Sequence, residues 1–306
     1  MIHEDQKLSF CRVCGSDAIE YLCDTQNEHS QTAVISNYRC RECGSVFVGN
    51  DISSDELGEA YSTLDSTGYY ADIEVENRQK MATAIAHLGT LISKSDSVID
   101  IGTGNGLFVK LLHEKGFEGV SAHEIEGSDL SGIEKIATHI FQDYDYNSIP
   151  SDFFDAATLL DVVEHVPDPG YLIRTCARVL KKDGFIYFHT PVVTQTDRVM
   201  HFVQKIPGLR KAGVIWQRGR TSVFHLQNYT PRSLTHLLIS SGFGDIKIEV
   251  RNELSWPVRK YVEIYLLEKQ GLPASLAPLI TPFVYPFLGT DLFNSNKAIV
   301  TARKEG

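Results

Sequence analysis

A glycine-rich stretch at residues 98–106 carries the pattern with the clearest chemical meaning. Two apolar β-formers lead into Asp100, and the glycines that follow stand at alternate positions, Gly102, Gly104 and Gly106. This order predicts a buried strand, a tight turn and the start of a helix. Glycines let a ligand approach the backbone, and the N–H groups at a helix start can bind a carboxylate or phosphate. The spacing G-x-G-x-G differs from the dinucleotide fingerprint G-x-G-x-x-G.

Polar residues stand at the ends of the strands expected after this turn. Four later segments have strand character: 120–124, 139–143, 153–161 and 184–191. The first three end in acids, and the last ends in a threonine and a proline. Because open α/β sheets bind ligands at the carboxyl ends of their strands, these side chains are expected to line one site.

These residues together resemble the class I S-adenosylmethionine-dependent methyltransferases. The resemblance covers about residues 60–250 and the final strand. It implies an α/β fold, a doubly wound Rossmann-like seven-stranded sheet, and S-adenosylmethionine as the cofactor. The matching residues, in chain order, are Asp100-Ile101-Gly102-Thr103-Gly104-Asn105-Gly106, Glu124, Phe154-Asp155, Glu164-His165-Val166-Pro167-Asp168-Pro169 and Thr190-Pro191.

The resemblance also implies roles for single residues. The three glycines would cradle the amino-acid and ribose portions of the cofactor, and Asp100 would order their loop. Glu124 would bind the ribose hydroxyls, although the family often has Asp-x-Ser there and Asp129-Leu130-Ser131 offers another register. The remaining predicted cofactor contacts are Gln142 and Asp143 beside the adenine, Asp161 on the methionine side, and Tyr70, which either closes over the cofactor or packs in the core.

Three histidines are candidates for a catalytic base: His165, His189 and His225. A neutral imidazole suits removal of a proton from a hydroxyl group, which methyl transfer to oxygen requires. Each of the three has packing or loop ordering as its alternative role.

Four of the six cysteines form two C-x-x-C-G elements, made by Cys11 with Cys14 and by Cys40 with Cys43. Two thiolates from each of two turns suit a tetrahedral structural zinc, with no position left open for substrate. Two disulfides are the alternative, disfavoured because the N-terminus has no apolar signal region. A segment of this size buries little core, so metal binding would supply its folding energy.

The predicted organisation has three parts. Residues 1–50 form a zinc ribbon, residues 51–95 a helical connector that contributes to the cofactor site, and residues 96–306 the methyltransferase domain. That domain carries insertions at about 195–228 and 253–293. The uncharged stretch 272–290 contains four prolines, so no membrane-spanning helix is expected, and a cytoplasmic location is predicted.

The charge distribution limits the possible partners. The net charge of −10 disfavours nucleic-acid binding. Residues 195–225 are the exception, because they hold six Lys or Arg and one Asp. This basic insertion either binds an acidic acceptor, such as a nucleotide-sugar or a phosphorylated lipid or glycan, or is a solvated loop. The aromatic insertion near the C-terminus is expected to wall the acceptor pocket, with a membrane or partner-subunit contact as the alternative.

The sequence therefore predicts an S-adenosylmethionine-dependent methyltransferase that acts on a small-molecule or sugar-containing acceptor, with O-methylation favoured. An RNA methyltransferase is one alternative, and the acidic balance outside the basic insertion argues against it. A non-catalytic cofactor-binding scaffold that uses the ribbon for protein interaction is the other. The glycine loop and acidic strand ends argue against a pure scaffold, which has no need of them.

Overall fold

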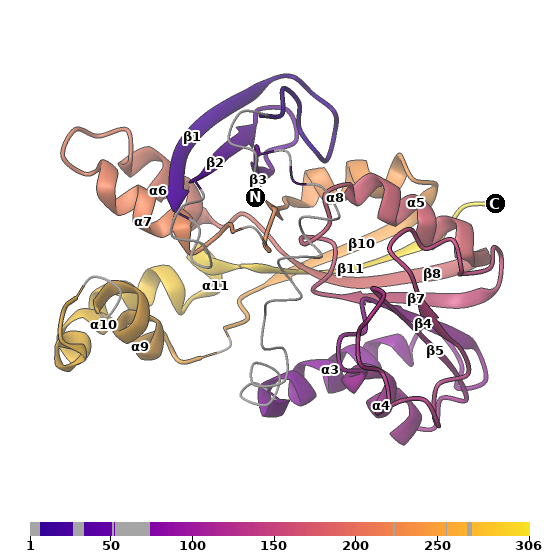
Figure 1. The fold of residues 1–306 in the computed structure, drawn as a ribbon. Coiled ribbons are helices and arrows are strands. Elements are labelled where there is room, and N and C mark those ends of the chain that lie inside the picture. Colours follow the sequence, from indigo (N-terminus) through magenta and orange to yellow (C-terminus); the bar gives the residue numbers. More distant parts are fainter. Residues whose placement is uncertain are drawn as a thin grey trace. The chain divides into compact units, whose positions relative to one another are not determined.

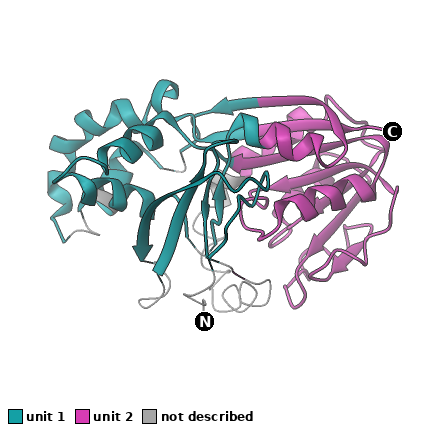
Figure 2. Ribbon diagram, turned by 90° about the horizontal axis from the view of Figure 1, so that it is seen from above, with its two compact units in different colours: residues 1–51, 191–233, 249–298 teal, residues 52–190, 234–248, 299–306 magenta. Residues whose placement is uncertain are grey.

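The computed structural model describes residues 7–26, 34–50, 52, 74–222, 224–254, 256–267 and 271–306 (Figure 1). The chain divides into two compact units, and each is described by itself (Figure 2). Unit 1 combines Met1–Asp51, Pro191–Ser233 and Glu249–Ala298, and unit 2 combines Ile52–Thr190, Leu234–Ile248 and Ile299–Gly306.

A seven-stranded sheet forms the centre of unit 2. Five strands are parallel neighbours, and β4 lies between β5 on one side and β7 on the other. The chain therefore reverses its direction of winding at β4, which creates the switch point where such sheets bind ligands. The predicted fold class is confirmed. In sheet order the strands are β10 (Phe243–Arg251), β11 (Lys297–Lys304), β8 (Leu180–Pro191), β7 (Phe154–Leu160), β4 (Ser97–Ile101), β5 (Gly119–Glu124) and β6 (Ile140–Gln142).

Helices pack against this sheet through apolar faces. Helix α4 (Leu107–Glu114) begins directly after the glycine turn and buries Leu107, Phe108, Leu111 and Leu112. The same core includes side chains from α3 (Glu74–Leu88), which lies within the predicted helical connector. On unit 2, α5 (Pro169–Val179) starts at Asp168, whose side chain accepts a hydrogen bond from the Tyr171 N–H. Helix α8 (Pro231–Ile239) begins at the predicted proline.

A smaller antiparallel sheet belongs to unit 1. Its order is β1 (Ile19–Gln26), β2 (Val34–Cys40), β3 (Val46–Val48) and β9 (Gln227–Asn228). The last pair joins the predicted ribbon to the end of the basic insertion, because Val46 is opposite Asn228 and Phe47 is opposite Gln227. Whether the predicted boundaries of residues 1–50, 51–95 and 96–306 separate independently folding domains stays a prediction.

A buried chain of hydrogen bonds also ties the basic insertion to the ribbon strands. The insertion forms α6 (Gln195–Val203) and α7 (Arg210–Arg218). His201 Nε2 lies 2.9 Å from Gln217 Oε1, and Gln217 Nε2 donates to Thr221 Oγ1. The Thr221 hydroxyl donates in turn to Asn37 on β2. All four side chains are buried. Replacing one of them would therefore leave its partners buried without a hydrogen bond.

The C-terminal insertion is mostly helical and also belongs to unit 1. Its helix α10 packs against Val258, Val262 and Leu267. None of the helices that the structure describes is both long and apolar enough to cross a lipid bilayer. Its elements are α9 (Val258–Tyr261), the π-helix η1 (Val262–Leu267), the 3-10 helix η3 (Ala274–Leu276), α10 (Ala277–Leu288) and α11 (Asp291–Asn294).

Candidate cofactor site and metal cluster

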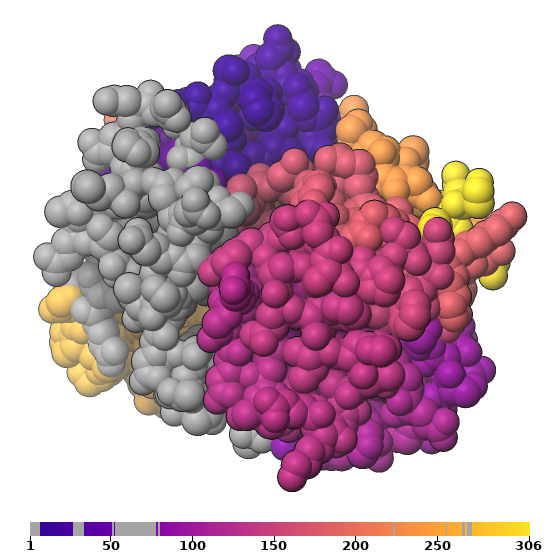
Figure 3. Space-filling view, turned by 45° about the vertical axis from the view of Figure 1, so that its right-hand side comes forward, coloured from indigo at the N-terminus to yellow at the C-terminus, as the bar shows by residue number. Residues whose placement is uncertain are grey.

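Strand register brings most of the predicted site residues to one edge of the unit 2 sheet. Asp100 is opposite Thr158 of β7, and Glu124 is opposite Gln142. Leu160, the residue before Asp161, is opposite His189 on β8. Figure 3 shows the magenta to pink part of the chain, which belongs to unit 2, gathered on the face in view.

The glycine turn requires glycine at each of its three positions. Gly102, Gly104 and Gly106 have φ angles of 72°, 57° and 75°, a region that other residues rarely adopt. A Cβ on Gly102 would lie 2.6 Å from Val162 Cγ2, and a Cβ on Gly106 would lie 2.5 Å from Ile133 Cγ2. The turn is therefore a close-packed cradle that side chains would fill.

Two sets of hydrogen bonds attach this turn to the end of β5. The N–H groups of Gly102 and Thr103 donate to the carbonyl of His123, over 2.9 and 3.1 Å. One carboxylate oxygen of Glu124 accepts from Gly104 N–H over 2.7 Å, and the other accepts from Ile125 N–H. Each of these oxygens retains a second lone pair for a further donor.

Asp100 lies beneath the turn and is buried. It accepts a hydrogen bond of 2.7 Å from the hydroxyl of Thr158. Burial raises the pKa of Asp100 to about 7, and the nearby Glu124 acts in the same direction, whereas hydrogen bonds from Thr158 and Thr103 oppose the shift. A cation bound near Asp100 would favour its charged form.

The end of β6 is held by its own loop. Asp143 accepts from the N–H groups of Tyr146 and Ser148, each over 2.7 Å, and lies 3.1 Å from His123 Nε2. Burial opposes ionisation, but the bonds from Ser148 and His123 outweigh it and lower the pKa of Asp143. The neighbouring Gln142 donates to the carbonyl of Ser128.

The loop after β7 contains an unusual backbone position and a buried acid. Asp161 has a φ of 59°, which aspartate tolerates better than most residues, and its N–H donates to the carbonyl of His189. Glu164 is fully buried and accepts from the hydroxyl of Thr190 over 3.1 Å. Burial raises the pKa of Glu164 to about 8, so this acid fixes the loop against β8 in its neutral form.

The three histidines have different surroundings. His165 is partly exposed in the loop after β7 of unit 2. His189 is buried, with its Nε2 2.7 Å from the hydroxyl of Tyr187. His225 is exposed and belongs to unit 1.

Some predicted residues are not placed here, and some informative ones were missed. Tyr70 lies outside the described residues. The rival acid Asp129 is exposed and accepts from Ser131 N–H within its own turn. Sequence reasoning assigned no role to Thr158, His123 or Glu164, although each is a polar residue within or beside an apolar strand pattern.

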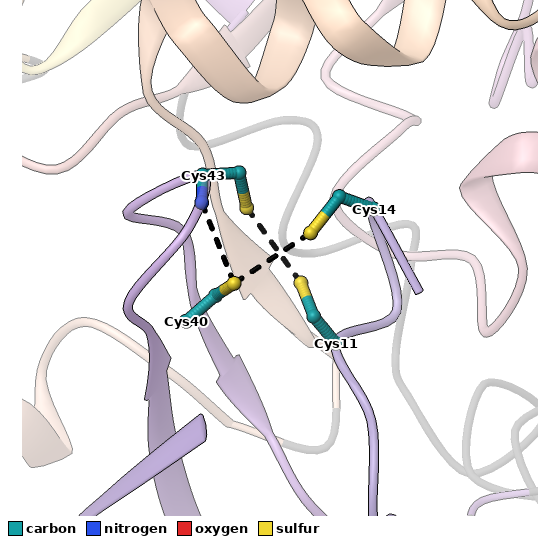
Figure 4. Close-up of side chains that lie close together, drawn as sticks. All are labelled: Cys11, Cys14, Cys40 and Cys43. Atoms are coloured by element: carbon teal, nitrogen blue, oxygen red, sulfur yellow. Dashed lines mark hydrogen bonds between the residues drawn. The ribbon is translucent and has the colours of Figure 1, made fainter. Parts of the chain in front are cut away.

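The four predicted cysteines come together in unit 1 (Figure 4). Their sulfur atoms all lie within 4.8 Å of one another. The Sγ atoms of Cys11 and Cys43 are 3.7 Å apart, and those of Cys14 and Cys40 are 3.6 Å apart. A tetrahedral zinc with Zn–S bonds of 2.3 Å would separate its sulfurs by about 3.8 Å, whereas a disulfide requires about 2.05 Å. The cluster therefore fits a metal and not two disulfides.

The surroundings of the cluster hold it in position. In each C-x-x-C-G element the glycine N–H donates to the carbonyl of the first cysteine. Gly15 donates to Cys11, and Gly44 donates to Cys40. The hydroxyl of Thr230 donates to the carbonyl of Cys43 over 2.6 Å. Residues before β1, at the turn between β2 and β3, and after β9 thus share in building this centre.

A family model described as a methyltransferase domain matches residues 74–248. This match spans more than half of the chain, so the chain belongs to this methyltransferase family, and its fold is that of the class I S-adenosylmethionine-dependent enzymes. The predicted family is confirmed.

Curated relatives share the name ubiquinone biosynthesis O-methyltransferase. The protein from Yersinia enterocolitica is 25% identical over 134 residues, which are 41% of this chain and 54% of the relative. The protein from Thiobacillus denitrificans is 31% identical over 106 residues, 30% of this chain and 43% of the relative. The chain thus spans about half the length of the curated relatives it matches.

A solved structure shows the same fold over more of the chain. It is phosphoethanolamine N-methyltransferase 2 of Haemonchus contortus with phosphomonomethylethanolamine and S-adenosylhomocysteine, at a TM-score of 0.53 and 14% identity. The alignment covers 92% of this chain and 71% of that one. At this level of sequence identity, the similarity shows a shared fold and nothing about function.

The raised pKa of Asp100 predicts a pH-dependent contribution to stability. Between about pH 4 and pH 7 the folded state keeps a proton that the unfolded chain has lost. This retained proton adds its full amount to the unfolding free energy below about pH 4, and the added stability is lost as the pH rises through 7. Between pH 5 and pH 8 the unfolding free energy of the wild type should therefore fall by about 2–3 kcal/mol relative to that of the Asp100→Asn variant, because about two pH units separate pH 5 from the folded-state pKa.

Urea unfolding of both proteins at the two pH values measures this change. Asp155→Asn serves as the control, because hydrogen bonds from Lys181 and Ser97 outweigh burial and lower the pKa of Asp155. Its effect on the unfolding free energy should be the same at both pH values. An equally flat difference for Asp100→Asn would contradict the assigned protonation.

Proposed function

We propose that this protein transfers a methyl group from S-adenosylmethionine to a hydroxyl of a small-molecule or sugar-containing acceptor, in the cytoplasm. The observation that carries the proposal is the cradle of three left-handed glycines, tied through Gly104 to the carboxylate of Glu124. An acid at the end of β5 beside such a turn suits the ribose hydroxyls of a nucleoside cofactor.

Most of the proposed cofactor contacts lie on the glycine turn and at the strand ends beside it. Gly102, Gly104 and Gly106 would face the amino-acid and ribose portions, and the spare lone pairs of Glu124 would accept from the ribose hydroxyls. Asp100 would order the turn and favour a cationic ligand. S-adenosylmethionine supplies, when bound, a methyl group on a sulfonium. The other proposed contacts are Tyr70, Gln142, Asp143 and Asp161.

Methyl transfer to oxygen requires removal of the acceptor's proton, and we favour His165 for this role. Its side chain is partly exposed beside the carboxyl end of β7, where an acceptor can reach it. His189 is buried with one ring nitrogen on Tyr187, which suits positioning, and His225 remains a candidate from unit 1. The O-methyltransferase names of the curated relatives agree with oxygen as the methylated atom.

The charge pattern supports an acidic small acceptor over RNA. The only strongly basic stretch, residues 195–225, is short, and the rest of the chain is acidic.

For the four cysteines we propose structural zinc. Four thiolates complete a tetrahedral shell, so the metal would stabilise unit 1 and take no part in the chemistry. The bond from Thr230 to Cys43 would pass this stabilisation to the end of the basic insertion.

The cofactor assignment is tested by calorimetric titration with S-adenosylmethionine. Wild-type protein should bind one equivalent, and Glu124→Gln should weaken binding about 10- to 100-fold, because a hydrogen bond to a charged group is lost. Glu126→Gln is the matched control, since Glu126 is exposed two residues away. Equal binding by all three proteins would contradict the role of Glu124.

The catalytic assignment is tested with labelled S-adenosylmethionine and a panel of nucleotide-sugars and phenolic acids. His165→Asn should lower the rate of methyl transfer about 100-fold or more and leave cofactor affinity unchanged. His113→Asn, an exposed change on α4, should have no effect. A larger loss of methyl-transfer rate in His189→Asn or His225→Asn would instead assign the base to that histidine. A product methylated on carbon or nitrogen would contradict O-methylation.

Removal of one cluster ligand tests the metal assignment. Purified wild-type protein should contain one zinc per chain by elemental analysis, and Cys40→Ser should lose it and lower the melting temperature. Cys23→Ala should retain the metal, because Cys23 is buried in the same unit but lies outside the cluster. Full zinc content in Cys40→Ser would rule out the four-thiolate site.

A further inference from the structure

Helix α10 is apolar on the face that it exposes as well as on the face that it packs. Ala277, Ile280, Val284 and Leu288 face the small core of the C-terminal insertion. On the outer side, Leu279 is 70% exposed and Phe283 is 79% exposed, and Phe287 continues the same line of residues. A helix that is apolar on all sides is normally buried. We therefore infer that another surface covers this outer face when the protein is bound to its partner.

Neighbouring helices of unit 1 add to the exposed apolar residues. Leu292 on α11 is 75% exposed, and Phe202 on α6 is 67% exposed. The start of α6 is attached to the end of α10, because the hydroxyl of Thr196 donates to the carbonyls of Phe287 and Phe293, over 2.8 and 3.1 Å. We define the apolar surface as Leu279, Phe283, Phe287, Leu292 and Phe202.

Unit 1 also carries exposed positive charge on α6 and on the first turn of α7. Arg198, Arg210 and Lys211 are exposed, and they form no ion pair with any residue that the structure describes. The exposed Leu209 stands directly before Arg210. In a chain with a net charge of −10, these cations provide a site to which an anionic surface is attracted.

We propose that this part of unit 1 binds the interfacial region of a membrane that contains anionic phospholipid. Leucine and phenylalanine side chains would enter the boundary between head groups and acyl chains, while the arginines and lysine contact the lipid phosphates. No helix needs to span the bilayer for this mode of binding.

The composition of the outer face favours lipid over a protein partner. Residues 278, 279, 282, 283, 286 and 287 are prolines, leucine and phenylalanines, and the chain has no charged residue from 272 to 290. Such a surface offers few polar groups to fix the orientation of a partner protein, whose interfaces combine an apolar centre with a polar rim. A fluid lipid surface makes no such demand.

The test measures sedimentation of the full chain with lipid vesicles, without cofactor or acceptor. Vesicles of phosphatidylcholine with phosphatidylglycerol should bind the protein at least tenfold more tightly than vesicles of phosphatidylcholine alone, and high salt should reduce the difference. The double variant Leu279→Ser with Phe283→Ser should weaken binding at least tenfold. Arg210→Glu with Lys211→Glu should remove the preference for anionic lipid.

Matched controls separate this effect from general changes in the surface. Ile239→Ser replaces an apolar residue on α8 that is also largely exposed, and Lys135→Glu reverses an exposed charge in unit 2. Both should bind vesicles as wild type does. Circular dichroism and titration with S-adenosylmethionine check that each variant is folded, so failure of the methyl-transfer proposal would be seen separately.

Two results would overturn the proposal. One is equal sedimentation with and without vesicles of either composition. The other is a wild-type dimer, seen by analytical ultracentrifugation, that the Leu279→Ser and Phe283→Ser variant dissociates while vesicle binding is absent. In that case a second copy of the chain covers the apolar surface.

Discussion

The site depends on the close approach of three backbone segments at the switch point of the sheet. The turn after β4 is drawn against β5 by bonds to the His123 carbonyl and the Glu124 carboxylate, and Val162 from the loop after β7 packs where Gly102 has no side chain. This packing leaves no room for a Cβ at Gly102 or Gly106. The requirement for glycine thus comes from the protein's own packing as well as from a ligand.

Two buried acids support this arrangement in a way that charged groups could not. Asp100 and Glu164 both have raised pKa values because burial disfavours their ionised forms. Below about pH 7 both groups are mostly neutral, so they hold the turn and the loop after β7 through hydrogen bonds at low energetic cost. Asp143 differs, because several donors stabilise its charge at the end of β6. One sheet edge therefore combines acids that are kept neutral with acids that are kept charged.

Sequence patterns predicted the elements well because the relevant signals are local. The strand–turn–helix at residues 98–112, the start of α8 at Pro231 and the pairing of two cysteine knuckles all follow from short-range spacing. The partners of Asp100 and His123 could not be predicted, since Thr158 and Asp143 meet them only through sheet register. The strand β9 was also missed, because two residues carry no periodicity and form a strand only beside β3.

The pairing of β3 with β9 has a consequence for the order in which the protein assembles during synthesis. Val46 and Phe47 leave the ribosome about 180 residues before Asn228 and Gln227, their partners. Until then the edge of β3 presents unpaired backbone groups, as does the carbonyl of Cys43 that Thr230 later binds. The nascent ribbon therefore stays incomplete, with this edge open to pairing with other chains, while much of the unit 2 sheet emerges.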